Sequence, residues 1–256
     1  MPATDLPLLI DAARAAGQIA MLHWRADPKT WKKSDDSPVS AADLDVDAAL
    51  RDALCGARPR YGWLSEESPD DGTRLGAEHC FIVDPIDGTR AYLDGQVDWG
   101  LSLAVAEGGQ ITAGVVHMPA KDLTYTAAID EGAFLNGEQI GATSATSTRD
   151  ATLLTSKATY ASANWKEGVP HFSRKFRPSM AYRMALVGEG RYDAMMTLKL
   201  AWEWDIAAGS LIAAEAGAIV TDRRGGPLRF NSETRRTNGV LAAPAGLHAA
   251  ILDALA

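Results

Sequence analysis

A short acidic segment behind an apolar strand is the part of this chain best suited to chemistry. It begins as a buried strand, Phe81-Ile82-Val83, and continues as Asp84-Pro85-Ile86-Asp87-Gly88-Thr89. Two carboxylates at a strand end can face one cavity, while Gly88 and Thr89 offer backbone N–H groups to an anion. An ordinary tight turn would also explain an Asp-Gly pair. The motif alone therefore leaves a metal and phosphate site and a turn equally open.

A second pair of carboxylates also follows a predicted strand. Glu66 and Glu67 come directly after the apolar run Tyr61-Gly62-Trp63-Leu64-Ser65. The alternative is a solvated pair in a turn that Ser65 caps. If the strand is real, both glutamates lie at a sheet edge, as Asp84 does.

Two further aspartates stand where helices are predicted to begin. Asp205 follows Trp202 and Trp204 and precedes an apolar helical run that stops at Gly217. It either caps that helix, or it is buried beside the tryptophans and must be paired, hydrogen-bonded or bound to a metal. Asp43, in Ser40-Ala41-Ala42-Asp43, fits a capping box, which would explain it without any function.

Taken together, four blocks of this sequence resemble the inositol monophosphatase family, the lithium-sensitive, magnesium-dependent phosphomonoesterases. They occur in the order typical of the family and across most of the chain. The blocks are Ser37-Pro38-Val39-Ser40-Ala41-Ala42-Asp43, Leu64-Ser65-Glu66-Glu67-Ser68, Asp84-Pro85-Ile86-Asp87-Gly88-Thr89 and Trp204-Asp205-Ile206-Ala207-Ala208-Gly209. One departure is Ser40, where the family usually has threonine, and the hydroxyl is kept.

The resemblance implies a magnesium site of two ions, or three. Its first ion would be bound by Glu66, Asp84 and the backbone carbonyl of Ile86. Its second ion would be bound by Asp84, Asp87 and Asp205, so that Asp84 bridges the two. Glu67 would lie behind these ligands or bind a third, weaker ion.

Catalytic and substrate-binding roles follow from the same resemblance. Asp43, Glu66 and Thr89 are implied to be catalytic, with Asp43 and the Thr89 hydroxyl orienting and deprotonating the attacking water. The residues implied to bind substrate are Asp87, Gly88, Thr89, Arg183 and Asp205. The five histidines lack metal-ligand spacing and are interpreted as structural or surface residues.

The substrate is less well defined than the reaction. The stretch that contains Arg183, residues 181–193, resembles the 3'(2'),5'-bisphosphate nucleotidase branch, which acts on 3'-phosphoadenosine 5'-phosphate, and a guanidinium could pair with the second phosphate. Inositol 1-phosphate is an alternative, with Glu203 as a candidate for hydroxyl recognition. Histidinol phosphate is another, because some family members that use it share the run ending at Arg90. Lys199 could bind substrate, but an ordinary position on the surface would explain it at least as well.

A protein that binds a phosphate ligand without turnover is an alternative of a different class. It is disfavoured because the carboxylates and Thr89 are all intact.

Composition limits the possible partners and the compartment. The chain has 256 residues with 25 basic and 33 acidic side chains, for a net charge of −8. This balance argues against nucleic-acid polymers and anionic membranes, whereas a phosphate ester could bind through divalent cations.

The N-terminus lacks a basic segment followed by an apolar core, and Cys55 and Cys80 are too few for a disulfide scaffold. A cytoplasmic protein is expected, and the resemblance suggests a homodimer.

An α/β (α+β) layered sandwich with alternating helix and sheet layers (αβαβα) is the expected fold. The first helix is predicted from about Leu6 to Trp24, and a polar mobile loop with Lys32 and Lys33 from Asp27 to Pro38. An antiparallel meander should follow, with strands at 81–83, 100–106, 111–117 and 123–127. Further elements are strands at 152–156 and 194–198, helices near 164–171, at 180–189 and from Asp205, and final strands near 218 and 240. A seam near 143–148 divides the chain into an N-terminal half, 1–142, with the metal site and a C-terminal half, 143–256, that supplies Asp205 and specificity.

Overall fold

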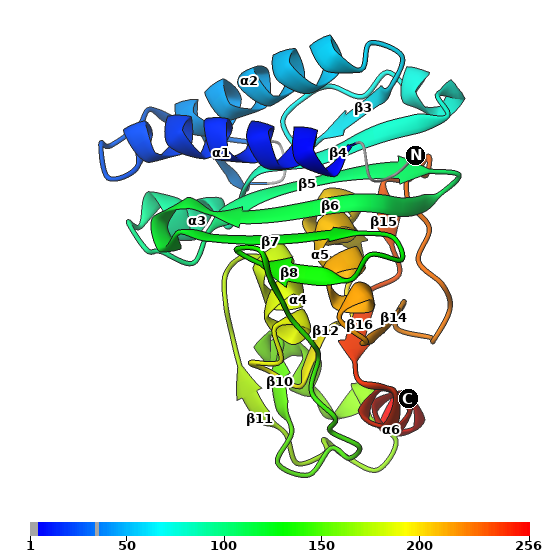
Figure 1. The fold of residues 1–256 in the computed structure, drawn as a ribbon. Helices are drawn as coiled ribbons and strands as arrows, with labels where there is room; N and C mark the ends of the chain where they lie inside the picture. The colour runs from blue at the N-terminus through cyan, green and yellow to red at the C-terminus, as the bar shows by residue number, and fades with distance from the viewer. Residues whose placement is uncertain (1–4, 34–35) are drawn as a thin grey trace.

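Five layers build the molecule, and they alternate between helices and sheets (Figure 1). The structure is a computed structural model that describes residues 5–33 and 36–256. The outer helix layer consists of α1 (Leu6–His23) and α2 (Ala41–Ala57). The middle helix layer consists of α4 (Met180–Gly188) and α5 (Glu203–Glu215), and α6 (Ala245–Ala254) covers the far side. The predicted αβαβα sandwich is confirmed.

The larger sheet has seven strands in the order β3-β4-β5-β6-β7-β8-β9. The strands are β3 (Gly62–Ser65), β4 (His79–Asp87), β5 (Gly100–Glu107), β6 (Gln110–Met118), β7 (Leu123–Ala128), β8 (Ala133–Leu135) and β9 (Glu138–Gln139). The antiparallel pairing of β4 through β7 confirms the predicted meander. By contrast, β3 runs parallel to β4 with Ser65 opposite Val83. Glu66, which follows β3, and Asp84, which follows Val83 within β4, therefore come at the same end of the two strands.

The smaller sheet has five strands in the order β11-β10-β12-β16-β14. They are β10 (Thr152–Leu154), β11 (Ser173–Lys175), β12 (Ala194–Thr197), β14 (Ile219–Thr221) and β16 (Val240–Ala243). Two short strand pairs complete the fold: β1 (Thr30–Lys32) with β2 (Pro38–Ser40), and β13 (Ala201–Trp202) with β15 (Arg236–Thr237). A short helix, α3 (Thr89–Leu93), follows β4. The 3₁₀ turns are η2 (Thr73–Gly76), η3 (Pro119–Lys121), η4 (Lys157–Tyr160) and η5 (Ser162–Asn164).

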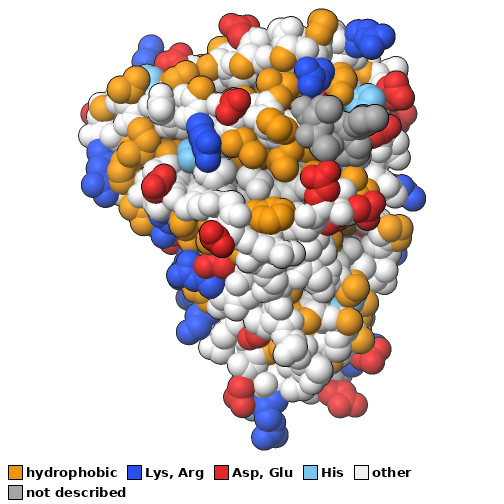
Figure 2. All heavy atoms as spheres, viewed as in Figure 1, with side chains coloured by type: hydrophobic (Ala, Val, Ile, Leu, Met, Phe, Trp, Pro, Cys, Tyr) orange, Lys and Arg blue, Asp and Glu red, His pale blue; other side chains and the backbone are white. Residues whose placement is uncertain are grey.

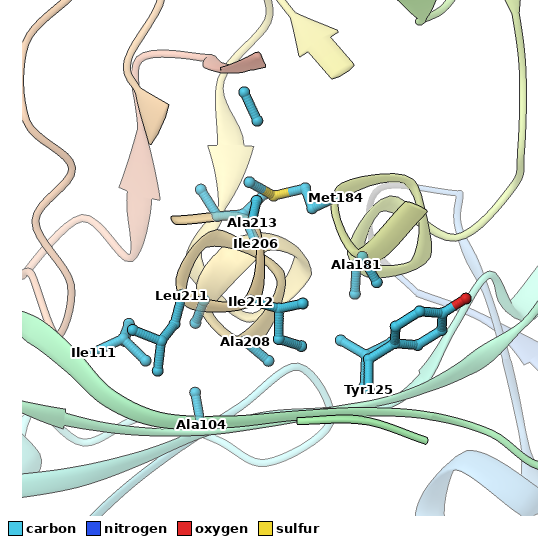
Figure 3. Close-up of a cluster of buried hydrophobic side chains, with 14 of the residues drawn as sticks. Ala104, Ile111, Tyr125, Ala181, Met184, Ile206, Ala208, Leu211, Ile212 and Ala213 are labelled. Carbon is cyan, nitrogen blue, oxygen red and sulfur yellow. The ribbon is translucent and has the colours of Figure 1, made fainter. Parts of the chain in front are cut away.

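Helix α5 lies between the two sheets and is apolar around most of its circumference. Ala208, Leu211 and Ile212 face the larger sheet, where Ala104 and Ile111 meet them (Figure 3). A helix that is apolar all round must be buried on every side. One apolar cluster thus draws on both sheets, although the two sheets lie on opposite sides of the proposed boundary at residues 142 and 143.

Two predicted elements differ from the structure. The helix near Asn164–His171 is wrong: only the turn η5 forms, because Gly168 adopts a left-handed φ of 91° and Pro170 has no N–H to continue a helix. The polar loop from Asp27 to Pro38 contains the β1–β2 hairpin, and its residues 34 and 35 lie outside the described part of the chain.

The molecular surface in Figure 2 carries acidic and basic side chains scattered over one face. Within residues 5–33 and 36–256, every helix is too short or too polar to cross a membrane.

Two glycine substitutions are predicted to change the free energy of unfolding in opposite directions, one where α4 packs against α5 and one in α2. A Cβ on Gly209 would lie 2.7 Å from the Cβ of Met184 and 3.1 Å from the carbonyl oxygen of Ala181. Gly209→Ala should therefore lower the free energy of unfolding by about 1–3 kcal/mol, because neither neighbour can move cheaply. Gly56→Ala, in α2 with nothing within 4 Å, should raise it by about 0.5–1 kcal/mol through helix propensity. Urea unfolding measures both, and equal effects would contradict this account of the packing.

Candidate active site

Carboxylates from three separate parts of the chain converge at one edge of the larger sheet. Asp84 and Asp87 come from the end of β4, and Asp205 comes from the first turn of α5. One carboxylate oxygen from each of the three lies within 4.8 Å of the other two. Glu66 lines the same cavity from the end of β3. The structure therefore brings all four predicted carboxylate ligands together.

A break in the strand pairing aims Asp84 and Asp87 at one cavity. Side chains three positions apart in a regular strand point to opposite faces. The pairing of β4 with β5 is interrupted between these two residues, where Pro85 has no N–H to donate. The N–H of Ile86 instead donates to Asp84 at 3.1 Å. The bulge thus turns both carboxylates to the same side.

Asp87 is held from the middle helix layer. One of its oxygens accepts hydrogen bonds from the Ser179 hydroxyl and from the backbone N–H of Ala181, both at 2.7 Å. Ser179 also caps α4 by accepting from the N–H of Tyr182. The start of α4 therefore fixes the carboxylate of Asp87 and leaves its other oxygen available.

The interpretation of Asp205 as a helix cap is wrong. The cap position of α5 is Trp202, so Asp205 lies within the first turn, beside the buried Trp204. Its carboxylate faces the cavity with Asp84 and Asp87. Asp205 is half-buried, and its position beside the other two carboxylates suits it to bind a metal.

Burial and mutual repulsion make these carboxylates hard to ionise together. Burial raises the pKa of Asp84 well above its ordinary value, and the negative charges of Glu66, Asp87 and Asp205 raise it further. Burial also raises the pKa of Asp205, with Asp87 and Glu66 adding to the effect. The pKa of Asp87 rises to about 6, again through burial, although Ser179 and Ala181 oppose the shift. An arrangement of this kind is destabilising unless a cation lies between the carboxylates.

Lys33, which the sequence places only in a polar loop, is a cation at this site. Its ammonium group donates to Glu66 at 2.6 Å and to Glu67 at 2.8 Å. Burial opposes its charge, but the two glutamates outweigh burial and raise the pKa of Lys33 above its ordinary value. Burial raises the pKa of Glu67 to about 7 in spite of the ion pair. Glu66 and Glu67 are thus held together by one lysine from the β1–β2 hairpin.

The donor set fits magnesium. The four side chains of the cluster, Glu66, Asp84, Asp87 and Asp205, all offer carboxylate oxygens, which are the hard ligands that Mg²⁺ prefers. The mutual repulsion described above is what a divalent cation would relieve. Glu66, Asp84, Asp87 and Asp205 are therefore suited to hold a metal ion.

Asp43 uses its two oxygens for different tasks. One oxygen accepts from the backbone N–H and the hydroxyl of Ser40, at 2.8 and 2.5 Å, which forms the predicted capping box of α2. The other lies 3.4 Å from the Thr89 hydroxyl, which is also 3.2 Å from the carbonyl oxygen of Ile86. A hydroxyl has one proton, so Thr89 can give its hydrogen to only one of these acceptors fully. Asp43 is therefore part of the capping box of α2 and also contacts Thr89, which lines the cavity.

Gly88 joins β4 to α3 in a left-handed conformation, with φ of 97°. A side chain here would be strained, and its Cβ would lie 3.3 Å from the carbonyl oxygen of Asp98. Glycine therefore lets the chain turn from the carboxylates to Thr89 within one residue.

Three of the proposed specificity residues are placed differently from the carboxylates. Arg183 is 7% exposed, and its guanidinium donates to the carbonyl oxygens of Arg177 and Pro178. Glu203 is fully buried and accepts from the backbone N–H groups of residues 231 and 232. Lys199 is exposed. None of the three is among the described residues that line the cavity.

Several residues that line the cavity beside the carboxylates were missed by sequence reasoning. The cavity has a volume of about 660 Å³, and its lining includes Arg90, Asp94, Gln96, Asp98, Phe176 and Pro178. No short motif marks these residues, because α3, the segment after it and the segment between β11 and α4 supply them. Of the described side chains that line it, none is a histidine, as expected for structural histidines.

Comparisons with known proteins agree with this geometry. The family model "Inositol monophosphatase family" matches residues 3–256. A fructose-1,6-bisphosphatase/inositol-1-monophosphatase of Thermotoga maritima is 34% identical over 224 residues, which cover 86% of this chain and 85% of that protein. The 3'(2'),5'-bisphosphate nucleotidase CysQ of Escherichia coli is 32% identical over 203 residues, which cover 77% and 81%. The solved structure of an IMPase from Thermotoga maritima has a TM-score of 0.85 at 28% identity, covering 99% of this chain and 96% of that one.

The chain belongs to the inositol monophosphatase family, a family of phosphatases. Both the resemblance inferred from the four sequence blocks and the prediction of a phosphatase are confirmed.

The raised pKa values predict a pH-dependent effect of magnesium on stability. Asp87 has a pKa of about 6 in the folded protein against an ordinary value of 3.8, so the folded state binds this proton more tightly than the unfolded chain does. Without metal, this group therefore lowers the free energy of unfolding as the pH rises from 3.8 to about 6, and its full cost is present above that range.

A cation bound to the ionised carboxylates offsets this cost. Mg²⁺ at about 100 times its Kd at pH 7.5 should stabilise the protein by about 2.7 kcal/mol at that pH. The same Mg²⁺ concentration should stabilise it clearly less near pH 5.5, where protons compete for the carboxylates. Thermal unfolding at both pH values with and without Mg²⁺ measures the difference. A stabilisation that is the same at the two pH values would count against this carboxylate set as the metal site.

Proposed function

We propose that this protein catalyses the Mg²⁺-dependent hydrolysis of a small-molecule phosphate monoester, with 3'-phosphoadenosine 5'-phosphate as substrate, as a 3'(2'),5'-bisphosphate nucleotidase. The observation that carries the reaction class is the convergence of Asp84, Asp87 and Asp205 within 4.8 Å, beside Asp43 and Thr89. Glu66 lines the same cavity. These groups combine a metal-binding cluster with a hydroxyl and carboxylate that can orient water.

The roles of the residues follow from their positions. Glu66, Asp84, Asp87, Asp205 and the carbonyl of Ile86 would hold magnesium, in two ions or three. Bound there, magnesium supplies Lewis-acid stabilisation of the phosphate oxygens and acidifies water. Gly88 and Thr89 would bind the phosphate, with Asp87 and Asp205 beside it.

Asp43 and Thr89 would activate the water. When the Thr89 hydroxyl donates a hydrogen bond to Asp43, the Thr89 oxygen can accept a hydrogen bond from a water molecule. This contact would orient a lone pair of the water toward phosphorus. Burial raises the pKa of Asp43, which brings this carboxylate nearer to the pH at which a base acts well.

Support for the substrate comes from the nucleotidase relative and from the size of the cavity. The two relatives described above are close in identity, 34% for the inositol phosphatase and 32% for the nucleotidase, and so their names do not decide the substrate. A cavity of about 660 Å³ has room for a nucleotide. Inositol 1-phosphate is the second candidate, but Glu203, the group that was to recognise its hydroxyls, is bound to residues 231 and 232 instead.

Four accompanying features belong to the same proposal. They are a homodimer, a cytoplasmic location, inhibition by lithium at the weaker magnesium position, and two structural halves, 1–142 and 143–256. The resemblance to the family supports the homodimer and the lithium inhibition. The Ser- and Thr-rich stretch from Thr143 to Thr148 supports the boundary.

Substrate choice is tested by phosphate release from three esters, measured side by side with Mg²⁺ and with EDTA. The esters are 3'-phosphoadenosine 5'-phosphate, myo-inositol 1-phosphate and histidinol phosphate. We expect phosphate release to depend on Mg²⁺ for every ester that the protein hydrolyses, and we expect kcat/KM to be highest for the nucleotide. A higher kcat/KM for another ester would overturn the nucleotidase assignment, and no release from any of them would overturn the phosphatase mechanism.

Asp84→Asn separates the catalytic role of the bridging carboxylate from any role in folding. The substitution keeps the shape of the side chain and removes one of several repelling charges, so the metal-free variant should unfold at a higher temperature than the metal-free wild type. Turnover should fall more than about 100-fold, because a direct ligand matters more than its supporting groups. Thermal unfolding with EDTA and a phosphate-release assay test the two halves of the prediction. Near-normal turnover would refute the bridging role of Asp84.

A further inference from the structure

Phe176 presents an aromatic ring to the cavity that the candidate metal ligands also line. It lies in the segment between β11 and α4, lines the cavity together with Pro178, and is 48% exposed. A single exposed apolar side chain needs no explanation by itself. Its fixation and its position in the cavity with the carboxylates are what set Phe176 apart.

The backbone around Phe176 is held by arginine side chains. The carbonyl oxygen of Phe176 accepts from Arg177 at 2.7 Å. The carbonyl oxygens of Arg177 and Pro178 accept from Arg183 at 2.5 and 3.1 Å. Three consecutive carbonyl groups are thus hydrogen-bonded to guanidinium groups. The ring therefore stands on a fixed segment, not on a free loop.

Arg183 also supports the ring itself. Its guanidinium carbon lies 4.5 Å from the centroid of the Phe176 ring, a cation–π contact. Arg183 is 7% exposed, so it is enclosed beneath the ring. Arg183 was expected to contact the second phosphate of a nucleotide. The geometry gives it a different task, because it holds the ring in place from behind.

The same cavity holds the groups proposed to bind metal and phosphate. The carboxylates and Thr89 line it, and Arg90 adds an exposed guanidinium. Within the described residues, the Arg90 side chain has no hydrogen-bonding or ion-pair partner, so it is free to bind an anion. The cavity therefore combines the carboxylates, a free cation and one apolar aromatic surface.

We propose that Phe176, supported by Arg183, is a stacking platform for the base of a nucleotide substrate. This inference rests on the proposed phosphatase function and names the part of the leaving group that the site recognises. Aromatic rings stack on bases through their faces with little dependence on sequence. Arg90 is placed to pair with a second phosphate, which a nucleoside bisphosphate has and inositol 1-phosphate lacks.

The test compares Phe176→Ala with Phe176→Trp. Stacking of one base corresponds to a change of roughly 5- to 150-fold in affinity, so Phe176→Ala should raise KM for 3'-phosphoadenosine 5'-phosphate by about that factor. The KM for myo-inositol 1-phosphate should change less than about twofold, since inositol has no aromatic face. Phe176→Trp should retain the wild-type KM for the nucleotide. Leu75→Ala serves as the control, because Leu75 is a similarly exposed apolar residue, at 43%, that does not line this cavity.

Two outcomes would overturn the platform. An equal rise in KM for both esters would show that Phe176 merely maintains the shape of the cavity. An unchanged KM for the nucleotide in Phe176→Ala would show that the ring makes no contact with the base. Thermal unfolding of the variants checks that each is folded, and an exposed ring predicts nearly wild-type stability.

Binding of AMP, measured by isothermal titration calorimetry with Mg²⁺, separates failure of the platform from failure of the proposed function. Binding needs no turnover, so weaker binding by Phe176→Ala than by wild type supports the platform even if no ester is hydrolysed. Equal binding by the two proteins, or none by wild type, refutes the platform while leaving the phosphatase assay to decide the reaction.

Discussion

The repulsion among four carboxylates that share one edge of a sheet is the constraint on which the site depends. Asp84, Asp87 and Asp205 are drawn together by the packing of β4 and α5, and Glu66 joins them because β3 runs parallel to β4. The raised pKa values of Asp84 and Asp205 show that the fold accepts an unfavourable local charge. A divalent cation bound between the carboxylates would relieve this repulsion.

Several local contacts in the surrounding structure hold these charged side chains in position. The bulge in β4 turns two carboxylates to one side, the start of α4 fixes Asp87 with two hydrogen bonds, and Lys33 clamps Glu66 to Glu67. Helix α5 is sandwiched between the sheets, so Asp205 cannot retreat from its neighbours without disturbing the apolar cluster that spans both. Packing energy thus maintains an arrangement that electrostatics opposes.

Local patterns made some of this predictable and left the rest out of reach. Apolar runs separated by turn residues predicted the meander, which the structure confirms. The family resemblance, together with carboxylates at strand ends, implied a set of acidic residues that the structure brings into one cavity. The rest depended on contacts that the sequence does not show. Arg183 has the type and neighbourhood of a phosphate ligand, and in the structure its guanidinium donates to carbonyl groups five and six residues earlier in the chain. Asp205 is not the cap of α5, because that helix begins two residues before it. Gly168 and Pro170 end a pattern that periodicity alone extends into a helix.

Asp43 shows how closely folding and chemistry can share one side chain. Its two oxygens divide between the start of α2 and Thr89, so an amide, which keeps only one acceptor oxygen, could satisfy one partner and must turn an N–H toward the other. A replacement at this position must therefore meet two demands at once, the cap of α2 and the contact with Thr89. Tolerance to mutation here is bounded by the geometry of the fold, whatever the reaction.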